Sequence, residues 1–281
     1  MGSSLDRRTA IRTSALGFLG LTYTFSSAKA GKAEPKMNTI PEHFPYIDPE
    51  IVSDVVGKSH FDLEAVKKLV DERPELARSA WDWRFGDFES AVGAASHVGR
   101  RDIALYLIGK GARPTIFTHA MLGQLEIVKA TIESVPGIQR TMGPHGISLL
   151  DHAYAGEHMK DKMTSLEVEN VQRTIEYLEN LGDAGGEDYV TLSAGEQTKY
   201  LGDYMYGEKE HEGFSIKLNM RKLMALAPIG EFGGALYKSG DNKFFYNGSP
   251  SVQVTFDIEN EIVKSLTLSE PGLSLKAEKV S

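Results

Sequence analysis

The chain has no cysteine among its 281 residues, so it forms no disulfide bonds and carries no lipid anchor of the lipoprotein type. Positive charge is also scarce, because 31 lysines and arginines stand against 39 aspartates and glutamates, for a net charge of −8. The basic residues form no stripe, which argues against binding to nucleic acid or to anionic membrane surfaces. Long apolar runs are missing as well. We therefore expect no nucleic-acid partner and no stable membrane anchor.

The N-terminal segment has the layout of an export signal. Twin arginines, Arg7-Arg8, precede a short apolar run at Ala15–Phe25, and the small residues of Ala28–Ala30 follow. The run is too short to span a bilayer, which needs about 20 residues. The arginine pair resembles the twin-arginine export motif. We predict a signal peptide at 1–30, a proline-rich linker at 31–49, and a periplasmic or secreted protein.

The region after the linker repeats itself. The segment Gly99–Ala112 can be laid over Gly123–Ile132, apolar residue on apolar residue, with a glycine at the head of each. The same pattern occurs at Phe61–Val70 and at Asn170–Gly182. Partner helices with small residues precede three of these segments, at Ser90–Gly99, Phe117–Gly123 and Ser148–Gly156. Such repetition predicts stacked helix pairs, in which each pair buries its apolar face against its neighbours.

The repeats resemble the ankyrin family over about residues 48–182, and we assign 50–182 to an ankyrin-like domain. The intervals between the corresponding positions Phe61, Gly99 and Gly123 are unequal, so the repeats are irregular. The resemblance implies an α-solenoid that binds ligands noncovalently through its finger loops and concave face. The alternative is an ordinary α-helical bundle with a chance similarity.

The pattern changes to two-residue alternation after a glycine-rich linker at 183–191. Alternating segments separated by turn residues predict about eight short antiparallel strands over 192–281, closed into a small β-barrel or a strongly bent sheet. Tyr200–Tyr204 and the strands after it resemble the small β domain appended to serine β-lactamase-like hydrolases. The nucleophile motif of those enzymes is missing, so no activity is carried over. The predicted fold class is α+β in separate domains.

Both tryptophans of the chain lie in one short segment, Trp81–Glu89, where an ankyrin stack projects its first finger loop. Aromatic and arginine side chains on a loop are typical of binding hot spots. The alternative is that Trp81 and Phe88 seal the gap between repeats. The candidate binding residues are Trp81, Asp82, Trp83, Arg84, Asp87, Glu89 and His145.

Histidines lie in or beside the first helices of successive repeats, at His97, His119 and His152, and another follows Pro144. A metal site needs three or four converging ligands. Because the sequence contains no close-spaced ligand pair, we predict no metal site and no cofactor, and we interpret these histidines as packed or helix-end residues. A general acid–base arrangement is the rival interpretation. Its candidate catalytic residues are Asp82, Asp87, Glu89, His97 and His145.

These observations predict an exported bacterial ankyrin-repeat binding protein that recognises a partner protein or an envelope ligand. One alternative is an envelope enzyme of the hydrolase or lyase type, directed at carbohydrate, that uses carboxylates and histidines in the groove. Another is a carrier of small apolar ligands built on the β domain, whose mouth its tyrosines and phenylalanines would line.

Overall fold

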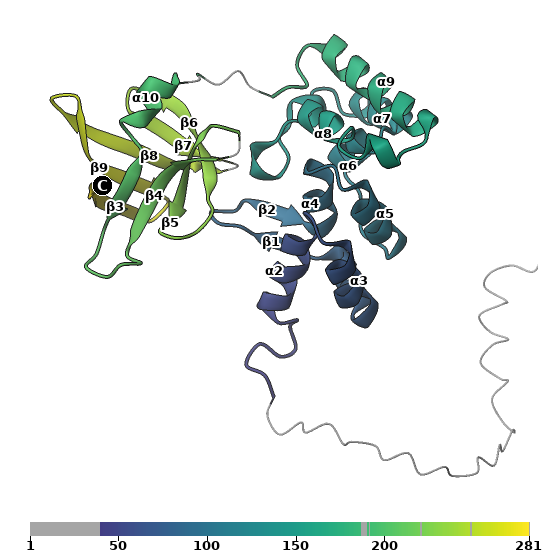
Figure 1. Ribbon diagram of the computed structural model, residues 1–281, viewed down its shortest axis with the longest axis horizontal. Helices are drawn as coiled ribbons and strands as arrows, with labels where there is room; N and C mark the ends of the chain where they lie inside the picture. Colours follow the sequence, from purple (N-terminus) through teal and green to yellow (C-terminus); the bar gives the residue numbers. More distant parts are fainter. Residues whose placement is uncertain (1–39, 187–189, 191, 220, 248, 281) are drawn as a thin grey trace, which may run out of the picture. The chain divides into compact units, whose positions relative to one another are not determined.

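The computed structural model describes residues 40–186, 190, 192–219, 221–247 and 249–280. The predicted signal peptide, residues 31–39 of the predicted linker 31–49 and part of the predicted linker 183–191 lie outside the described residues. Helices fill the first half of this range and strands fill the second, so the α+β fold class is confirmed (Figure 1). No helix in the described ranges combines the length and apolar character required to cross a bilayer.

The helical part consists mainly of short helices that follow one another as pairs. Figure 1 shows the first helices α4, α6 and α8 next to one another, and α6 packs against both of the others. The helices are α2 (Pro49–Lys58), α3 (Leu63–Glu72), α4 (Ala91–His97), α5 (Arg101–Gly109), α6 (Ile116–Met121), α7 (Leu125–Ser134), α8 (Leu149–Ala155) and α9 (Ser165–Leu181). The last helix begins earlier than the predicted Asn170, because Thr164 and Glu167 form a capping box.

Polar caps explain where several of these helices start. The side chains of Asp48, Asp62, Ser90 and Ser148 accept hydrogen bonds from the first-turn amides of α2, α3, α4 and α8. The small residues predicted at close helix contacts are fully buried: Ala94, Ala95, Ala120 and Ala153. Bulkier side chains at these positions would hold neighbouring helices apart.

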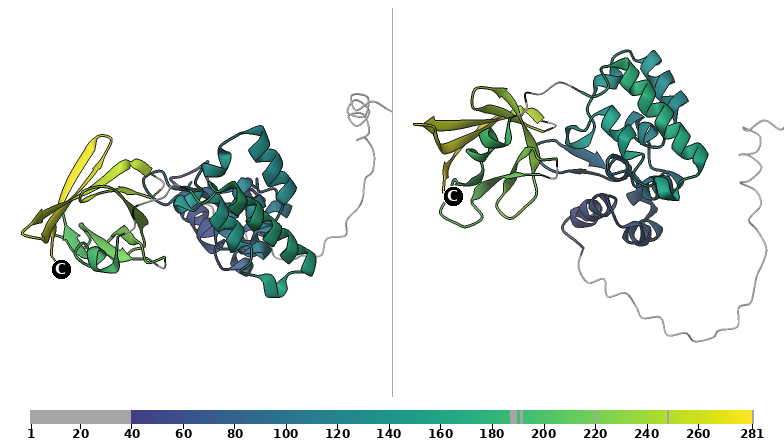
Figure 2. Two further views of the ribbon diagram at one scale, coloured as in Figure 1. Left: turned by 90° about the horizontal axis from the view of Figure 1, so that it is seen from above. Right: turned by 45° about the horizontal axis from the view of Figure 1, so that its top comes forward.

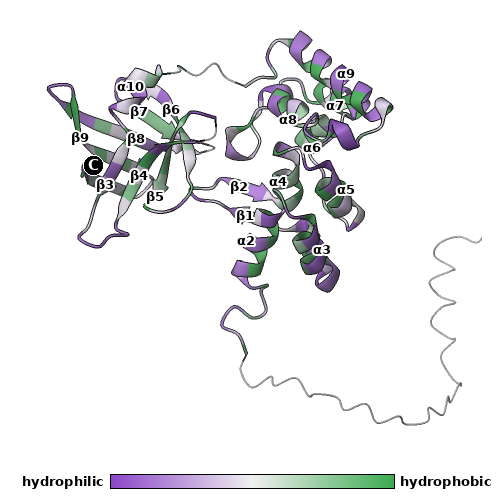
Figure 3. Ribbon diagram, in the orientation of Figure 1, coloured by the Kyte–Doolittle hydropathy of each residue, from purple (hydrophilic) through white to green (hydrophobic). Residues whose placement is uncertain are grey.

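A β-hairpin separates the first two helix pairs, at the position where the sequence predicted a finger loop. Its strands β1 (Ala80–Asp82) and β2 (Phe88–Ser90) pair antiparallel, with Trp81 opposite Glu89. Because successive side chains of a strand point to opposite faces, Phe88 is exposed while its neighbour Glu89 is buried. Figure 3 shows β2 as hydrophilic and the following helix α4 as largely hydrophobic. The hairpin thus turns one carboxylate towards the helices.

The second half forms a closed antiparallel barrel of eight strands, the first of the two predicted forms of this domain (Figure 2). Each strand pairs with the next along the chain, and the last pairs with the first through Lys279 and Tyr204. A short helix that the sequence analysis did not predict, α10 (Ala194–Thr198), precedes them. The strands are β3 (Gly202–Met205), β4 (Gly213–Leu218), β5 (Met224–Pro228), β6 (Gly234–Gly240), β7 (Lys243–Tyr246), β8 (Ser249–Glu259), β9 (Ile262–Glu270) and β10 (Leu273–Lys279).

Aromatic side chains fill the barrel interior. Most of the aromatic residues noted in the sequence belong to its buried core: Tyr200, Tyr204, Phe214, Phe244, Tyr246 and Phe256. Four of them, Tyr200, Tyr204, Phe244 and Phe256, pack on one another with ring centroids 4.7 to 5.8 Å apart. This packing favours a structural role for the aromatic set over the lining of a carrier's ligand cavity.

Residues 43–281 form one compact unit that includes both the helices and the barrel. The loop of the hairpin contacts the barrel directly. Ser249 Oγ donates a hydrogen bond to the carbonyl of Phe85, and Arg84 forms an ion pair with Glu231. The prediction of separately folding domains stays a prediction.

The glycines at the head of the repeated segments occupy a special conformation, and we expect their replacement to destabilise the helical part. Gly123 has a φ of +69°, and an added Cβ would lie 2.7 Å from the amide nitrogen of Val171. Backbone strain and overpacking together should lower the free energy of unfolding of Gly123→Ala by about 2 to 5 kcal/mol. Denaturant unfolding followed by circular dichroism measures this. Gly109→Ala is the matched control, because nothing lies within 4 Å of its added Cβ. Equal stability of the two variants would contradict the expectation.

Candidate metal centre

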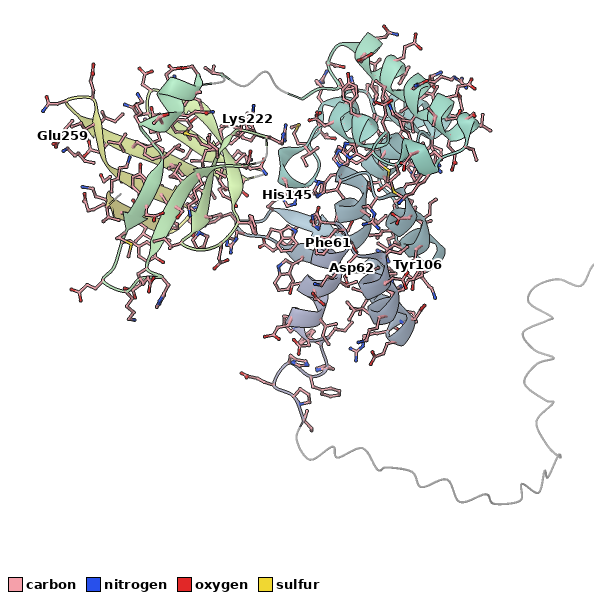
Figure 4. All side chains as sticks on the ribbon, viewed as in Figure 1. Phe61, Asp62, Tyr106, His145, Lys222 and Glu259 are labelled. Atoms are coloured by element: carbon pink, nitrogen blue, oxygen red, sulfur yellow. The ribbon has the colours of Figure 1, made fainter. Side chains whose placement is uncertain are left out.

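Four side chains that are distant in the sequence converge at the inner side of the hairpin. They are His60, Glu89, His97 and His145, and one ligating atom from each lies within 4.8 Å of the others. His60 follows α2, Glu89 lies on β2, His97 is the last residue of α4, and His145 lies in the 3₁₀ turn η3 (Pro144–Gly146). Figure 4 labels His145 among these elements. Three imidazoles and a carboxylate form a donor set that zinc commonly binds in proteins.

The carboxylate of Glu89 lies at the middle of the cluster. His97 Nε2 is 3.0 Å from its Oε1, while His60 Nε2 and His145 Nε2 are 3.4 and 3.5 Å from its Oε2. Two ligands of one tetrahedral zinc ion lie about 3.4 Å apart when each zinc–ligand bond is about 2.0 to 2.2 Å. The distances from Glu89 to the three imidazoles are therefore close to the spacing around a shared ion, and all four ligating atoms lie within 4.8 Å of one another.

Two of these atoms lack a hydrogen bond although they are buried. Within the described part of the chain, Glu89 Oε1 and His97 Nε2 have no hydrogen-bond partner, because their short approach does not have the angles of a hydrogen bond. The side chain of Glu89 is 0% exposed, and that of His97 is 10% exposed. A buried polar atom without a partner costs about 1 to 3 kcal/mol. An ion between the two atoms would satisfy both of them.

Hydrogen bonds to the far side of two imidazoles orient them towards the cluster. His145 Nδ1 lies 2.8 Å from Asp87 Oδ2, and the amide of His145 donates to Asp87 Oδ1 at 2.9 Å. His60 Nδ1 lies 3.0 Å from the carbonyl oxygen of Gly57. Because these oxygens accept hydrogen bonds, each Nδ1 carries the proton and each Nε2 is left as a ligating atom. Carboxylate–histidine and carbonyl–histidine pairs of this kind are typical of metal sites.

Asp87 also holds the backbone of His145 in a conformation that non-glycine residues rarely adopt. His145 has a φ of 59° and a ψ of 21°, in the left-handed region. Such strain costs about 1 to 3 kcal/mol and tends to occur at functional sites. The two hydrogen bonds from His145 to the buried carboxylate of Asp87 offset this cost and fix the direction of the ring.

Charge is distributed unequally over the cluster. Burial opposes ionisation of Glu89, but the contacts with His145 and His97 outweigh it and hold the pKa of the carboxyl well below its usual range. Burial also opposes the charged form of His145, but Asp87 and Glu89 outweigh it and raise the pKa of the imidazole to about 10. Burial lowers the pKa of His60. In the metal-free protein the carboxylate is thus paired with a protonated His145, and an incoming metal ion would replace that proton.

The hairpin residues predicted to bind a partner have mainly internal contacts. The indole Nε1 of Trp83 donates to Glu89 Oε2 at 2.7 Å, and Trp81 packs against the core of the first helices. Arg84 contacts the barrel through Glu231 and the carbonyl of Phe232. Phe88, proposed as a seal between repeats, is 68% exposed.

The residues of the predicted acid–base arrangement come together except for one. Asp87, Glu89, His97 and His145 lie in or beside the cluster, whereas Asp82 accepts hydrogen bonds from the amides of Arg84 and Gly86 in the turn. His60 was not among the residues predicted for the site, and no metal site was predicted. A signal was available, because His60 and His97 both lie at the ends of first helices, and the ends of stacked helices meet at one edge.

Comparisons of the chain with protein-family models, with curated proteins and with solved structures found no match.

Proposed function

We propose that this protein binds a divalent transition-metal ion of the zinc type through His60, Glu89, His97 and His145. The observation that carries the proposal is the approach of Glu89 Oε1 and His97 Nε2, which are buried, 3.0 Å apart and not hydrogen-bonded. Imidazole and carboxylate ligands suit zinc better than they suit calcium or magnesium, which prefer oxygen ligands alone.

We further propose that the frame of the site is an ankyrin-like stack. The paired short helices, the hairpin between the first two pairs and the left-handed glycines Gly99 and Gly123 support this architecture. In such a stack the ligand site lies where the finger loop meets the first helices, and the metal cluster occupies that place. The protein would then be a binding protein that recognises its ligand from the inner side of the hairpin.

The twin-arginine-like segment supports export to the periplasm or beyond, as part of the same proposal. Histidine and carboxylate ligands suit such a compartment, because they do not oxidise to disulfides as thiolate ligands do. The absence of cysteine from the chain agrees with this choice of ligands.

Cobalt titration of the metal-free protein tests the proposal, because cobalt occupies zinc sites and gives a visible absorption spectrum when histidines bind it. We expect the spectrum to saturate at one ion per chain and to be abolished by added zinc. Asp87→Asn should weaken zinc binding by about 10- to 100-fold, since the variant loses the carboxylate that orients His145.

Asp82→Asn is the matched control for this experiment, because Asp82 lies in the same hairpin and accepts hydrogen bonds from the amides of the turn. It should bind zinc as the parent protein does. A protein that takes up neither cobalt nor zinc, or equal affinities of the two variants, would refute the metal centre.

A further inference from the structure

A cavity of about 490 Å³ lies against the metal cluster, within the size range of small-molecule sites. Its lining comes from the hairpin, from α6 and its preceding residue, and from the segment that leads from Met142 into α8. Glu89 and His152 both line it. The lining of the cavity therefore includes one proposed metal ligand and one histidine that lies outside the cluster.

His152, which lines this cavity, has an unused hydrogen-bond acceptor. The residue is 0% exposed, and its Nδ1 lies 2.8 Å from the carbonyl oxygen of Ser148. Since that oxygen can only accept, Nδ1 carries the proton, and the neutral ring has its lone pair at Nε2. His152 Nε2 has no hydrogen-bond partner among the residues that the structure describes. A ligand that donates a hydrogen bond would satisfy it.

The lining of the cavity offers no cationic side chain to an anionic ligand. The residues that line the cavity include the carboxylates Asp87 and Glu89 but no lysine or arginine. A divalent ion on Glu89 would bring the sum of these charges to zero. The other polar groups are the hydroxyls of Ser90 and Thr115, and Phe117 supplies an apolar wall with its ring centroid 4.8 Å from that of His152. Hydroxyl groups beside an aromatic face fit an uncharged ligand with several hydroxyls of its own.

We propose that this cavity binds a neutral polyhydroxyl ligand, of the size and chemistry of a monosaccharide unit. One ligand hydroxyl donates to His152 Nε2, a second ligand oxygen joins the four protein ligands of the metal ion as a fifth group beside Glu89, and an apolar C–H face packs on Phe117. The inference rests on the proposed metal centre and adds the class of molecule that the centre recognises.

The test uses the full chain loaded with zinc, with imidazole nitrogens labelled for NMR. The probes are D-glucose, D-mannose and N-acetyl-D-glucosamine, and the comparison set is acetate and inorganic phosphate. We expect at least one of the sugars to shift the Nε2 resonance of His152 in a saturable way, and the anions to leave it unshifted. Saturable binding of an anion in place of the sugars would overturn the proposal.

Two variants separate this inference from the metal proposal. His152→Gln should weaken sugar binding at least about 10-fold while zinc affinity stays as in the parent, because His152 is not a member of the cluster. Gly143→Ala leaves every polar group in place but puts a methyl 2.8 Å from His152 Cε1, and should also weaken sugar binding. Melting temperatures of both variants check that they fold.

The outcomes are distinguishable. Zinc binding without any sugar response, or an unchanged sugar affinity in both folded variants, overturns the ligand class and leaves the metal centre standing. Failure to bind zinc or cobalt overturns both.

Discussion

Replacing Glu89 with glutamine is expected to weaken zinc binding by at least about 100-fold, which is the upper end of the effect of losing a group that only orients a ligand. Glu89 supplies the negative charge of the cluster, and its oxygens lie 3.0 to 3.5 Å from three imidazole nitrogens. The amide of glutamine has one oxygen and no charge, so it provides a much weaker ligand. Competition between the protein and a chromogenic zinc chelator measures the change.

The stability of the Glu89 variant needs its own measurement. Removing one partner of a buried ion pair can cost about 3 to 5 kcal/mol, and His145 would lose such a partner. His60→Asn is the milder second variant, because the side chain of His60 is 23% exposed and lies at a helix end. Glu126→Gln, at an exposed position of α7, is the matched control. Parent-like zinc affinity in both folded cluster variants would show that the four residues do not form a metal site.

Zinc itself should stabilise the folded protein strongly. An ion that binds only the folded state at a free concentration about 1,000 times its dissociation constant adds about 4 kcal/mol to the free energy of unfolding. The four ligands come from separate elements, so the unfolded chain offers no comparable site. Thermal unfolding with and without zinc measures this effect, and a chelator should reverse it.

Selectivity provides the control for this second prediction. Magnesium should leave the melting temperature unchanged, because it prefers oxygen ligands in octahedral geometry. At the same zinc concentration, a 100-fold weaker affinity reduces the stabilisation of the Glu89→Gln variant to about 1.4 kcal/mol or less. An equal rise in melting temperature with zinc and with magnesium would indicate nonspecific binding to an acidic chain. An equal rise in the parent protein and in the Glu89→Gln variant would indicate the same.

The sequence predicted the elements well because their signals are local. Period-2 alternation and turn residues gave the eight strands of the barrel, and repeated glycine and alanine placements gave the helix pairs. Gly99 and Gly123 head the repeated segments in the sequence and have φ values of +72° and +69° in the structure. Helix α10 was missed because its signal is only five residues long.

The candidate site was harder to predict because it depends on distances between segments. Asp87, Glu89, His97 and His145 were selected by their chemistry, whereas their contacts with His60 follow from how the helix ends stack. A metal site was not expected because ligands were sought as close-spaced pairs. Here each ligand comes from a different element, and only the fold brings them together.

Because the four proposed ligands come from four separate elements, the course of folding also affects which metal ion the site can take up. The centre is complete only after the chain has folded from α2 as far as η3. The compartment in which the chain folds is therefore the first in which the proposed ion can bind. If the chain is folded before it crosses the membrane, as the twin-arginine route requires, then the metal pool of the cytoplasm has the first access to the site. If folding follows export, the surroundings of the cell have it instead.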